Sequence, residues 1–203
     1  HVGYVEWNPY CQRVIAARIA DGLLDRAPIF TDVREFAQSG AADQYRGIAD
    51  VVSAGFPCQP FSVAGLRKGL DDPRGNLMLA YLAVAARYRP RWLVWENVPG
   101  VLSSSGGRDF GAFLGGLGQL GYGFAYRVLD AQFVRVDGFG RAVPQRRRRV
   151  FVVGHSGDWR RAAAVLFERH SLSGNPAPSR EKGKGFAHDT APCLTSSGRG
   201  VER

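Results

Sequence analysis

Short apolar runs alternate along the chain with longer stretches that have helical spacing. The runs have the length of strands and end in polar or turn-forming residues, whereas the longer stretches repeat apolar side chains every three or four positions. The pattern predicts strands at 1–7, 28–33, 50–52, 92–95, 124–130 and 150–154. It predicts helices at 9–21, 77–89 and 109–120, and a short helix from residue 158. Because strand and helix alternate, we expect an α/β fold with a mostly parallel sheet.

Two connections and the end of the chain depart from this pattern. Residues 63–76 have almost no periodicity, as is typical of a functional loop, and residues 131–144 form a second long connection. Residues 171–203 are rich in Ser, Gly, Pro and charge, with too little apolar content to pack alone. We therefore expect a folded domain over residues 1–155 and a linker-like segment over 156–203.

The 45% hydrophobic and 22% charged content is ordinary for a soluble globular protein and does not indicate a class of partner. The balance between positive and negative residues is more informative. Lys and Arg outnumber Asp and Glu by 27 to 18, which gives a net charge of +9 and a pI near 10.0. Such a balance indicates a protein that meets a polyanion, although general solubility would explain it equally well. No apolar run approaches the ~20 residues of a membrane span and no signal peptide is recognisable, so we expect a cytoplasmic protein without a membrane partner.

The cysteines and histidines argue against disulfides and metal. Cys11, Cys58 and Cys193 are odd in number and far apart, and the four histidines have no metal-ligand spacing. We expect reduced thiols and no metal site.

Three polar features lie at predicted strand ends. Cys58 follows an apolar run within a rigid turn containing Pro57 and Pro60, Glu96 follows another such run, and Arg147 and Arg149 precede a third. A lone cysteine of this kind usually packs as a small hydrophobe. The three groups together, however, could act on a ring substrate. The thiol can add to an electron-poor ring carbon, the carboxylate can activate that ring by hydrogen bonding, and a guanidinium can hold the carbonyl oxygen of the ring.

These groups can meet only if one strand runs against the others. If the strand at 150–154 ran parallel to its neighbours, Arg147 and Arg149 would lie at the edge of the sheet opposite Cys58 and Glu96. The connection 131–144 is too short for a full helical crossover and suits a hairpin with the strand at 124–130. We therefore predict one antiparallel strand, with Arg147 or Arg149 facing the same cleft as Cys58 and Glu96.

At these residues the chain resembles the cytosine-C5 methyltransferases, particularly the bacterial and phage DNA enzymes. Pro57-Cys58-Gln59-Pro60-Phe61-Ser62 is similar to the family's nucleophile motif, Glu96-Asn97-Val98 to its carboxylate motif, and Gln145-x-Arg147-x-Arg149 to its arginine motif. The motifs occur in the family's order and at fitting separations. The resemblance implies a Rossmann-like methyltransferase fold that uses S-adenosylmethionine.

The resemblance also assigns cofactor contacts. Glu6 and Trp7 look like the acid and aromatic residue that take the ribose and adenine of S-adenosylmethionine, and Asp32 and Val33 like the pair that reads the adenine edge. Phe56 and Pro57 match further contacts to the same cofactor.

The reaction that the resemblance implies begins with a cytosine flipped out of double-stranded DNA. Cys58 would attack C6, Glu96 would hold N3 and the exocyclic amine, and Arg149 and Arg147 would contact the base carbonyl and fix the site. The segment that resembles the family's closing loop contains Arg67, Lys68 and Arg74, whose charges could hold phosphates. Two further arginines, Arg146 and Arg148, alternate with the catalytic pair and are expected to contact phosphate or solvent.

The chain also departs from the family. The family's first strand, which lies centrally in the sheet, and its glycine-rich cofactor turn have no counterpart in residues 1–203, nor do its late helix motifs. We therefore expect an incomplete fold that is inactive by itself, with 156–203 holding only the start of a target-recognition region. Two alternatives stay open: a tRNA-methylating branch that shares the motifs, and a non-catalytic nucleic-acid-binding remnant. A restriction-modification role would imply a cognate endonuclease as a partner in function rather than by contact.

Overall fold

The computed structural model describes residues 1–55, 77–134 and 142–167. These residues form six strands: β1 (Tyr4–Val5), β2 (Ile29–Phe30), β3 (Val51–Gly55), β4 (Trp92–Asn97), β5 (Tyr122–Asp130) and β6 (Arg148–Ser156). The α-helices are α1 (Pro9–Ala20), α2 (Val33–Gln38), α4 (Leu77–Tyr88), α5 (Arg108–Gln119) and α6 (Trp159–Leu166). Short 3-10 helices connect them at Ala41–Tyr45, Pro99–Leu102, Ser104–Gly107 and Ala131–Phe133. Each helix predicted from the sequence is present within one or two residues of its expected ends.

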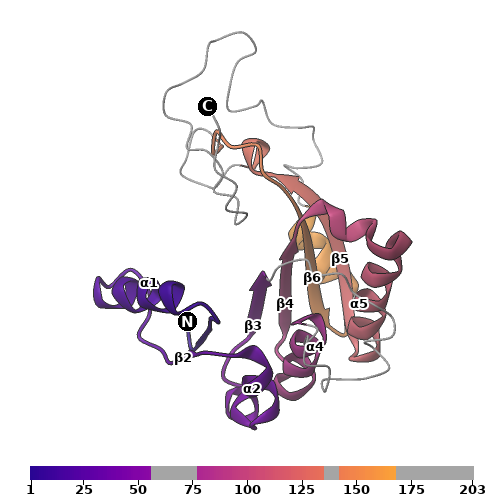
Figure 1. Cartoon of the computed structure of the whole chain (residues 1–203). Helices are drawn as coiled ribbons and strands as arrows, with labels where there is room; N and C mark the ends of the chain where they lie inside the picture. The colour runs from indigo at the N-terminus through magenta and orange to yellow at the C-terminus, as the bar shows by residue number, and fades with distance from the viewer. Residues whose placement is uncertain (56–76, 135–141, 168–203) are drawn as a thin grey trace.

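Four of the strands form one sheet in the order β3-β4-β6-β5 (Figure 1). β3 and β4 pair in parallel, and β6 pairs antiparallel with β4 on one side and with β5 on the other. β3, β4 and β5 therefore share one direction and β6 alone runs against them. The predicted antiparallel strand and its hairpin with β5 are confirmed, and β6 lies inside the sheet rather than at its edge.

The remaining two strands form a separate parallel pair, β1-β2, set apart from β3 in Figure 1. Within the described residues, β1 pairs only with β2 and β3 only with β4. The sheet is therefore divided into two pieces whose facing edges are unpaired.

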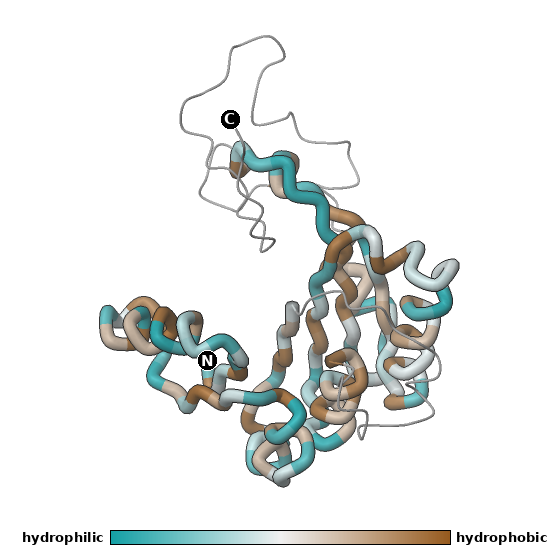
Figure 2. Tube along the Cα trace, viewed as in Figure 1, coloured by the Kyte–Doolittle hydropathy of each residue, from teal (hydrophilic) through white to brown (hydrophobic). Residues whose placement is uncertain are grey.

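The main core lies between the four-stranded sheet and helices α4 and α5. Trp95 of β4 is 1% exposed and its ring centroid lies 4.6 Å from that of the buried Phe113 of α5. A smaller cluster around Val153, Ala162 and Leu166 lies under α6, on β6. Apolar residues from both faces of the sheet are thus covered, as the unbroken apolar runs predicted, and Figure 2 shows these hydrophobic stretches along the strands.

Helix α1 begins as its sequence predicts but buries nothing. The Asn8 side chain accepts hydrogen bonds from the backbone of Tyr10 and Cys11, Pro9 occupies the first turn, and Gly22 takes φ 73° just beyond the end. None of its residues is buried, and Val14, on the apolar side expected from the sequence, is 43% exposed. None of the helices in the described residues is long and apolar enough to cross a membrane.

The contact between β5 and α6 gives a first prediction. A Cβ at Gly123 would lie 2.2 Å from the backbone nitrogen of Trp159 and 2.7 Å from its Cα. Because backbone atoms cannot rotate away, α6 would have to move, and we expect Gly123→Ala to lower the free energy of unfolding by about 1–3 kcal/mol in urea denaturation. Gly118→Ala in α5, where a Cβ meets nothing within 4 Å, is the matched control and should be neutral or stabilising by up to about 1 kcal/mol. Equal unfolding midpoints for the two variants would contradict this packing.

Candidate functional site

The candidate site lies where β3 and β4 end and β6 begins. Gly55, the last residue of β3, pairs with Glu96 of β4. A Cβ at Gly55 would lie only 3.2 Å from Glu96 Oε2, so the end of β3 lies directly beside this carboxylate. Cys58 itself, with Phe56 and Pro57, lies outside the described residues.

Two arginines converge on the Glu96 carboxylate. Arg147 Nη2 lies 3.3 Å and Arg149 Nε 3.0 Å from the same atom, Glu96 Oε1. The two side chains share one face of the chain because they are two residues apart in an extended segment. Arg146 and Arg148, on the alternate positions, are exposed. The sequence predicted that Arg147 or Arg149 would face Glu96, and both contact it, which the antiparallel direction of β6 makes possible.

Sequence reasoning missed the residue that fastens this arginine segment. Asp130, at the end of β5, accepts a hydrogen bond from the backbone N–H of Arg147 at 3.1 Å and others from Gln132. Burial alone would raise the pKa of the Asp130 carboxyl, but these hydrogen bonds and the nearby charge of Arg148 together outweigh it, and the pKa lies below its ordinary value. The only signal in the sequence was an acid at a strand end before an arginine run.

A cavity of about 750 Å³ lies between β1-β2 and β3. Glu6, Trp7, Asp32 and Val33 all line it, so the structure brings together the four described residues that the resemblance assigned to the cofactor. The opposite wall is β3, and the rest is largely apolar, with side chains from α2 and α4. In the described residues this cavity lies between the two separate pieces of sheet, so its volume includes the space between their edges.

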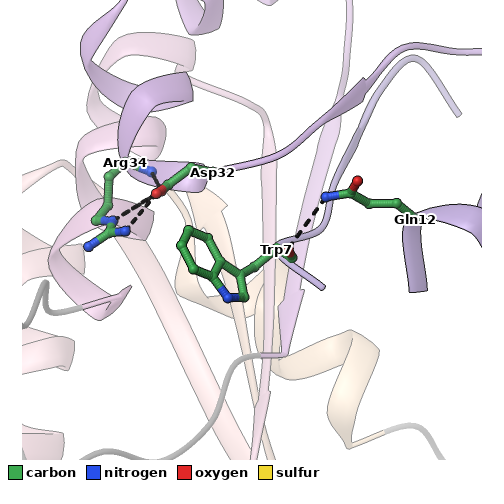
Figure 3. A network of polar contacts seen from close by, with 4 residues as sticks. All are labelled: Trp7, Gln12, Asp32 and Arg34. Carbon is green, nitrogen blue, oxygen red and sulfur yellow. Dashed lines mark hydrogen bonds and ion pairs between the residues drawn. The ribbon is translucent and has the colours of Figure 1, made fainter. Parts of the chain in front are cut away.

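Asp32 is already engaged by a residue that sequence reasoning did not select. Its carboxylate accepts from the Arg34 backbone N–H at 2.7 Å, which caps α2, and pairs with the Arg34 guanidinium at 2.6 Å (Figure 3). The guanidinium hydrogen bond lowers the pKa of the Asp32 carboxyl, and the same contact raises the pKa of Arg34. The guanidinium carbon also lies 5.7 Å from the centroid of the Trp7 ring, which is 71% exposed.

The lining fits the adenosine part of S-adenosylmethionine. The exposed Trp7 ring offers a face for stacking, and the carboxylates of Glu6 and Asp32 offer acceptors for ribose hydroxyls and an exocyclic amine. Glu6 Oε1 accepts from the Asn8 backbone at 2.7 Å, which fixes the direction of that side chain. In the part of the chain that the structure describes, no group of three or more His, Cys, Asp or Glu residues could hold a metal ion.

Residues 1–184 match the family described as C-5 cytosine-specific DNA methylase. Type II methyltransferase M.BsuFI of Bacillus subtilis is 34% identical over 153 residues, covering 75% of this chain and 33% of its own length. M.NgoBI of Neisseria gonorrhoeae is 34% identical over 151 residues, covering 74% and 42%. A protein of Escherichia phage P1 named DNA N-6-adenine-methyltransferase is 39% identical over 183 residues, covering 66% and 23%. The chain thus spans about a quarter to two fifths of the length of these relatives.

Two solved structures share the fold. A DNMT2 mutant of Spodoptera frugiperda superposes with a TM-score of 0.57 at 20% identity, covering 77% of this chain and 43% of that one. The Dnmt2 methyltransferase of S. pombe gives 0.52 at 19% identity, covering 78% and 42%. The predicted Rossmann-like methyltransferase fold is confirmed.

Proposed function

Because the chain belongs to the C-5 cytosine-specific DNA methylase family, we propose that the protein of which these residues form the catalytic part methylates C5 of cytosine in DNA. The observation that carries the proposal is the Glu96 carboxylate, held by Arg147 and Arg149 beside the strand that leads into Cys58. Addition to a pyrimidine ring needs a nucleophile, a hydrogen-bonding group for the ring nitrogen and a cation for the ring carbonyl. The thiol, the carboxylate and the two guanidinium groups would supply all three.

In the proposed mechanism Cys58 is the nucleophile. Its thiolate adds to C6 of a cytosine that has been flipped out of the duplex, because C6 of a stacked base lies beyond its reach. The new S–C6 bond places the electron pair of the C5–C6 double bond on C5. After methylation, loss of the C5 proton restores the double bond and expels Cys58 as a thiolate.

Glu96 and the arginines prepare the ring for that attack. Glu96 would accept a hydrogen bond from the exocyclic amine and, when its carboxyl carries a proton, donate that proton or a hydrogen bond to N3, which draws electron density away from C6. Arg149 contacts the base carbonyl, and Arg147, which shares the Glu96 oxygen, keeps the carboxylate oriented.

S-adenosylmethionine, held by Glu6, Trp7, Asp32 and Val33 with Phe56 and Pro57, would supply the methyl group as an electrophile. Arg67, Lys68 and Arg74 would bind DNA phosphates, and their electrostatic contribution would fall as the salt concentration rises. These three cations, like Phe56 and Pro57, lie outside the described residues.

The test is methyl transfer by the protein encoded by the complete reading frame around residues 1–203. With methyl-labelled S-adenosylmethionine and genomic DNA that lacks base methylation, we expect the label in 5-methylcytosine after digestion to nucleosides. Label in N6-methyladenine would support the activity named for the phage P1 relative and contradict the proposal. In a parallel reaction with unmodified tRNA, label in tRNA but not in DNA would move the substrate to RNA, and no label in either substrate would favour a non-catalytic nucleic-acid-binding remnant.

A further inference from the structure

We propose that Asp130 is a positioning residue that holds Arg147 against Glu96. Asp130 ends β5 opposite Arg148, the first residue of β6. Its Oδ1 accepts from the backbone N–H of Arg147 at 3.1 Å, and the neighbouring Ala131 N–H donates to the Arg147 carbonyl at 3.0 Å. Both polar groups of the Arg147 backbone are therefore tied to the end of β5.

This tie matters because Arg147 lies just outside the ladder of β6. Arg149 is paired with Leu129 inside the β5–β6 ladder, whereas Arg147 precedes the first residue of the strand. The position of the Arg147 side chain, 3.3 Å from Glu96 Oε1, consequently depends on Asp130 and Ala131 far more than that of Arg149 does. Removal of the Asp130 carboxylate should release Arg147 and leave Arg149 in place.

Asp130 contacts Arg147 through the Arg147 backbone, whereas the guanidinium of Arg147 contacts Glu96. Oδ1 accepts from two backbone N–H groups, of Arg147 and Gln132, and Oδ2 accepts from the Gln132 side-chain amide at 2.8 Å. Asp130 therefore fixes the backbone of the segment that contains Arg147, rather than the arginine side chain itself. In the proposed function, which the kinetic part of this inference rests on, Asp130 thus acts on the reaction through Arg147 without touching the substrate.

The first test does not require methyl transfer. In residues 1–203, Asp130→Ala should speed hydrogen exchange of the Arg147 amide by at least about tenfold, because a hydrogen bond of about 1.4 kcal/mol corresponds to that factor. Asp130→Asn, which keeps an Oδ1 acceptor, should restore most of the protection. Unchanged exchange in Asp130→Ala would overturn the proposal, whether or not the protein proves to be a methyltransferase.

The second test uses the active protein. Asp130→Ala should lower kcat about ten- to a hundredfold, since a misplacement of about 1 Å can cost that much, while KM for DNA changes less than about twofold. Asp130→Asn should recover most of kcat. The control is Asp158→Ala, which removes a comparable side-chain-to-backbone hydrogen bond, to Arg160 at 2.9 Å, at the start of α6. Asp158→Ala should lower stability but leave kcat unchanged, and an equal loss of kcat in both variants would reduce Asp130 to a structural role.

Discussion

Cys58→Ser should abolish the covalent capture of DNA that carries 5-fluorocytosine at the target base. In the active protein, the thiolate adds to C6 and the methyl group is transferred, but fluorine cannot leave C5 as a proton does. The adduct therefore persists and resists denaturant. A serine hydroxyl is a far weaker nucleophile than a thiolate and has no base assigned to it in the proposed site, so no adduct should form.

The measurement is a shift in mobility under denaturing electrophoresis after incubation with the fluorinated DNA and S-adenosylmethionine. Cys11→Ser is the matched control, because Cys11 is a half-buried residue of α1 outside the candidate site, and it should retain the adduct. Cys193→Ser should retain it as well. An adduct that survives in Cys58→Ser, or one that disappears in Cys11→Ser, would show that a different group attacks the base.

The local elements of the fold could be predicted because their signals are local. Asn8 and Pro9 start α1, Asp158 starts α6, and an unbroken apolar run forms β4. The antiparallel course of β6 is predictable for a different reason, because Arg147 and Glu96 can share one edge of the sheet only if β6 runs against β4. The prediction is correct because the direction of β6 decides whether its first or its last residues lie beside the end of β4.

Two contacts at the candidate site could not be predicted, because they join residues that lie far apart in the sequence. Asp130 and Arg147 are 17 positions apart and meet through a hydrogen bond between a side chain and a backbone amide. Trp7 and Arg34 meet across two segments that pair with each other at β1 and β2. Their residue types are compatible with many exposed positions, so neither contact had a recognisable pattern. The roles of Cys58, Phe56 and Pro57 stay predictions, because these residues lie outside the described part of the chain.

The divided sheet bears directly on cofactor binding. β1 and β2 contribute only two residues each to their pair, and a two-stranded piece of this size is marginally stable by itself. Glu6 and Trp7 follow β1, whereas the opposite wall of the cavity belongs to β3. Val5 and Val51, on the two facing strands, are 40% and 53% exposed. A ligand in the cavity would have to fix the positions of both walls, and the free energy that this ordering costs would weaken its binding.

The polypeptide of residues 1–203 is therefore expected to bind S-adenosylmethionine with a dissociation constant well above the micromolar range, measured by isothermal titration calorimetry. A strand between β1 and β3, as the family resemblance implies, would pair both free edges and fix the two walls, which would also remove edges that invite aggregation. The comparison is the protein encoded by the complete reading frame around these residues, and it should bind more tightly. In that protein, Trp7→Ala should weaken binding about tenfold, because the lost stacking contact contributes about 1–1.5 kcal/mol. Micromolar binding by residues 1–203 alone would show that the divided sheet already holds the cofactor and that the cavity needs no further strand.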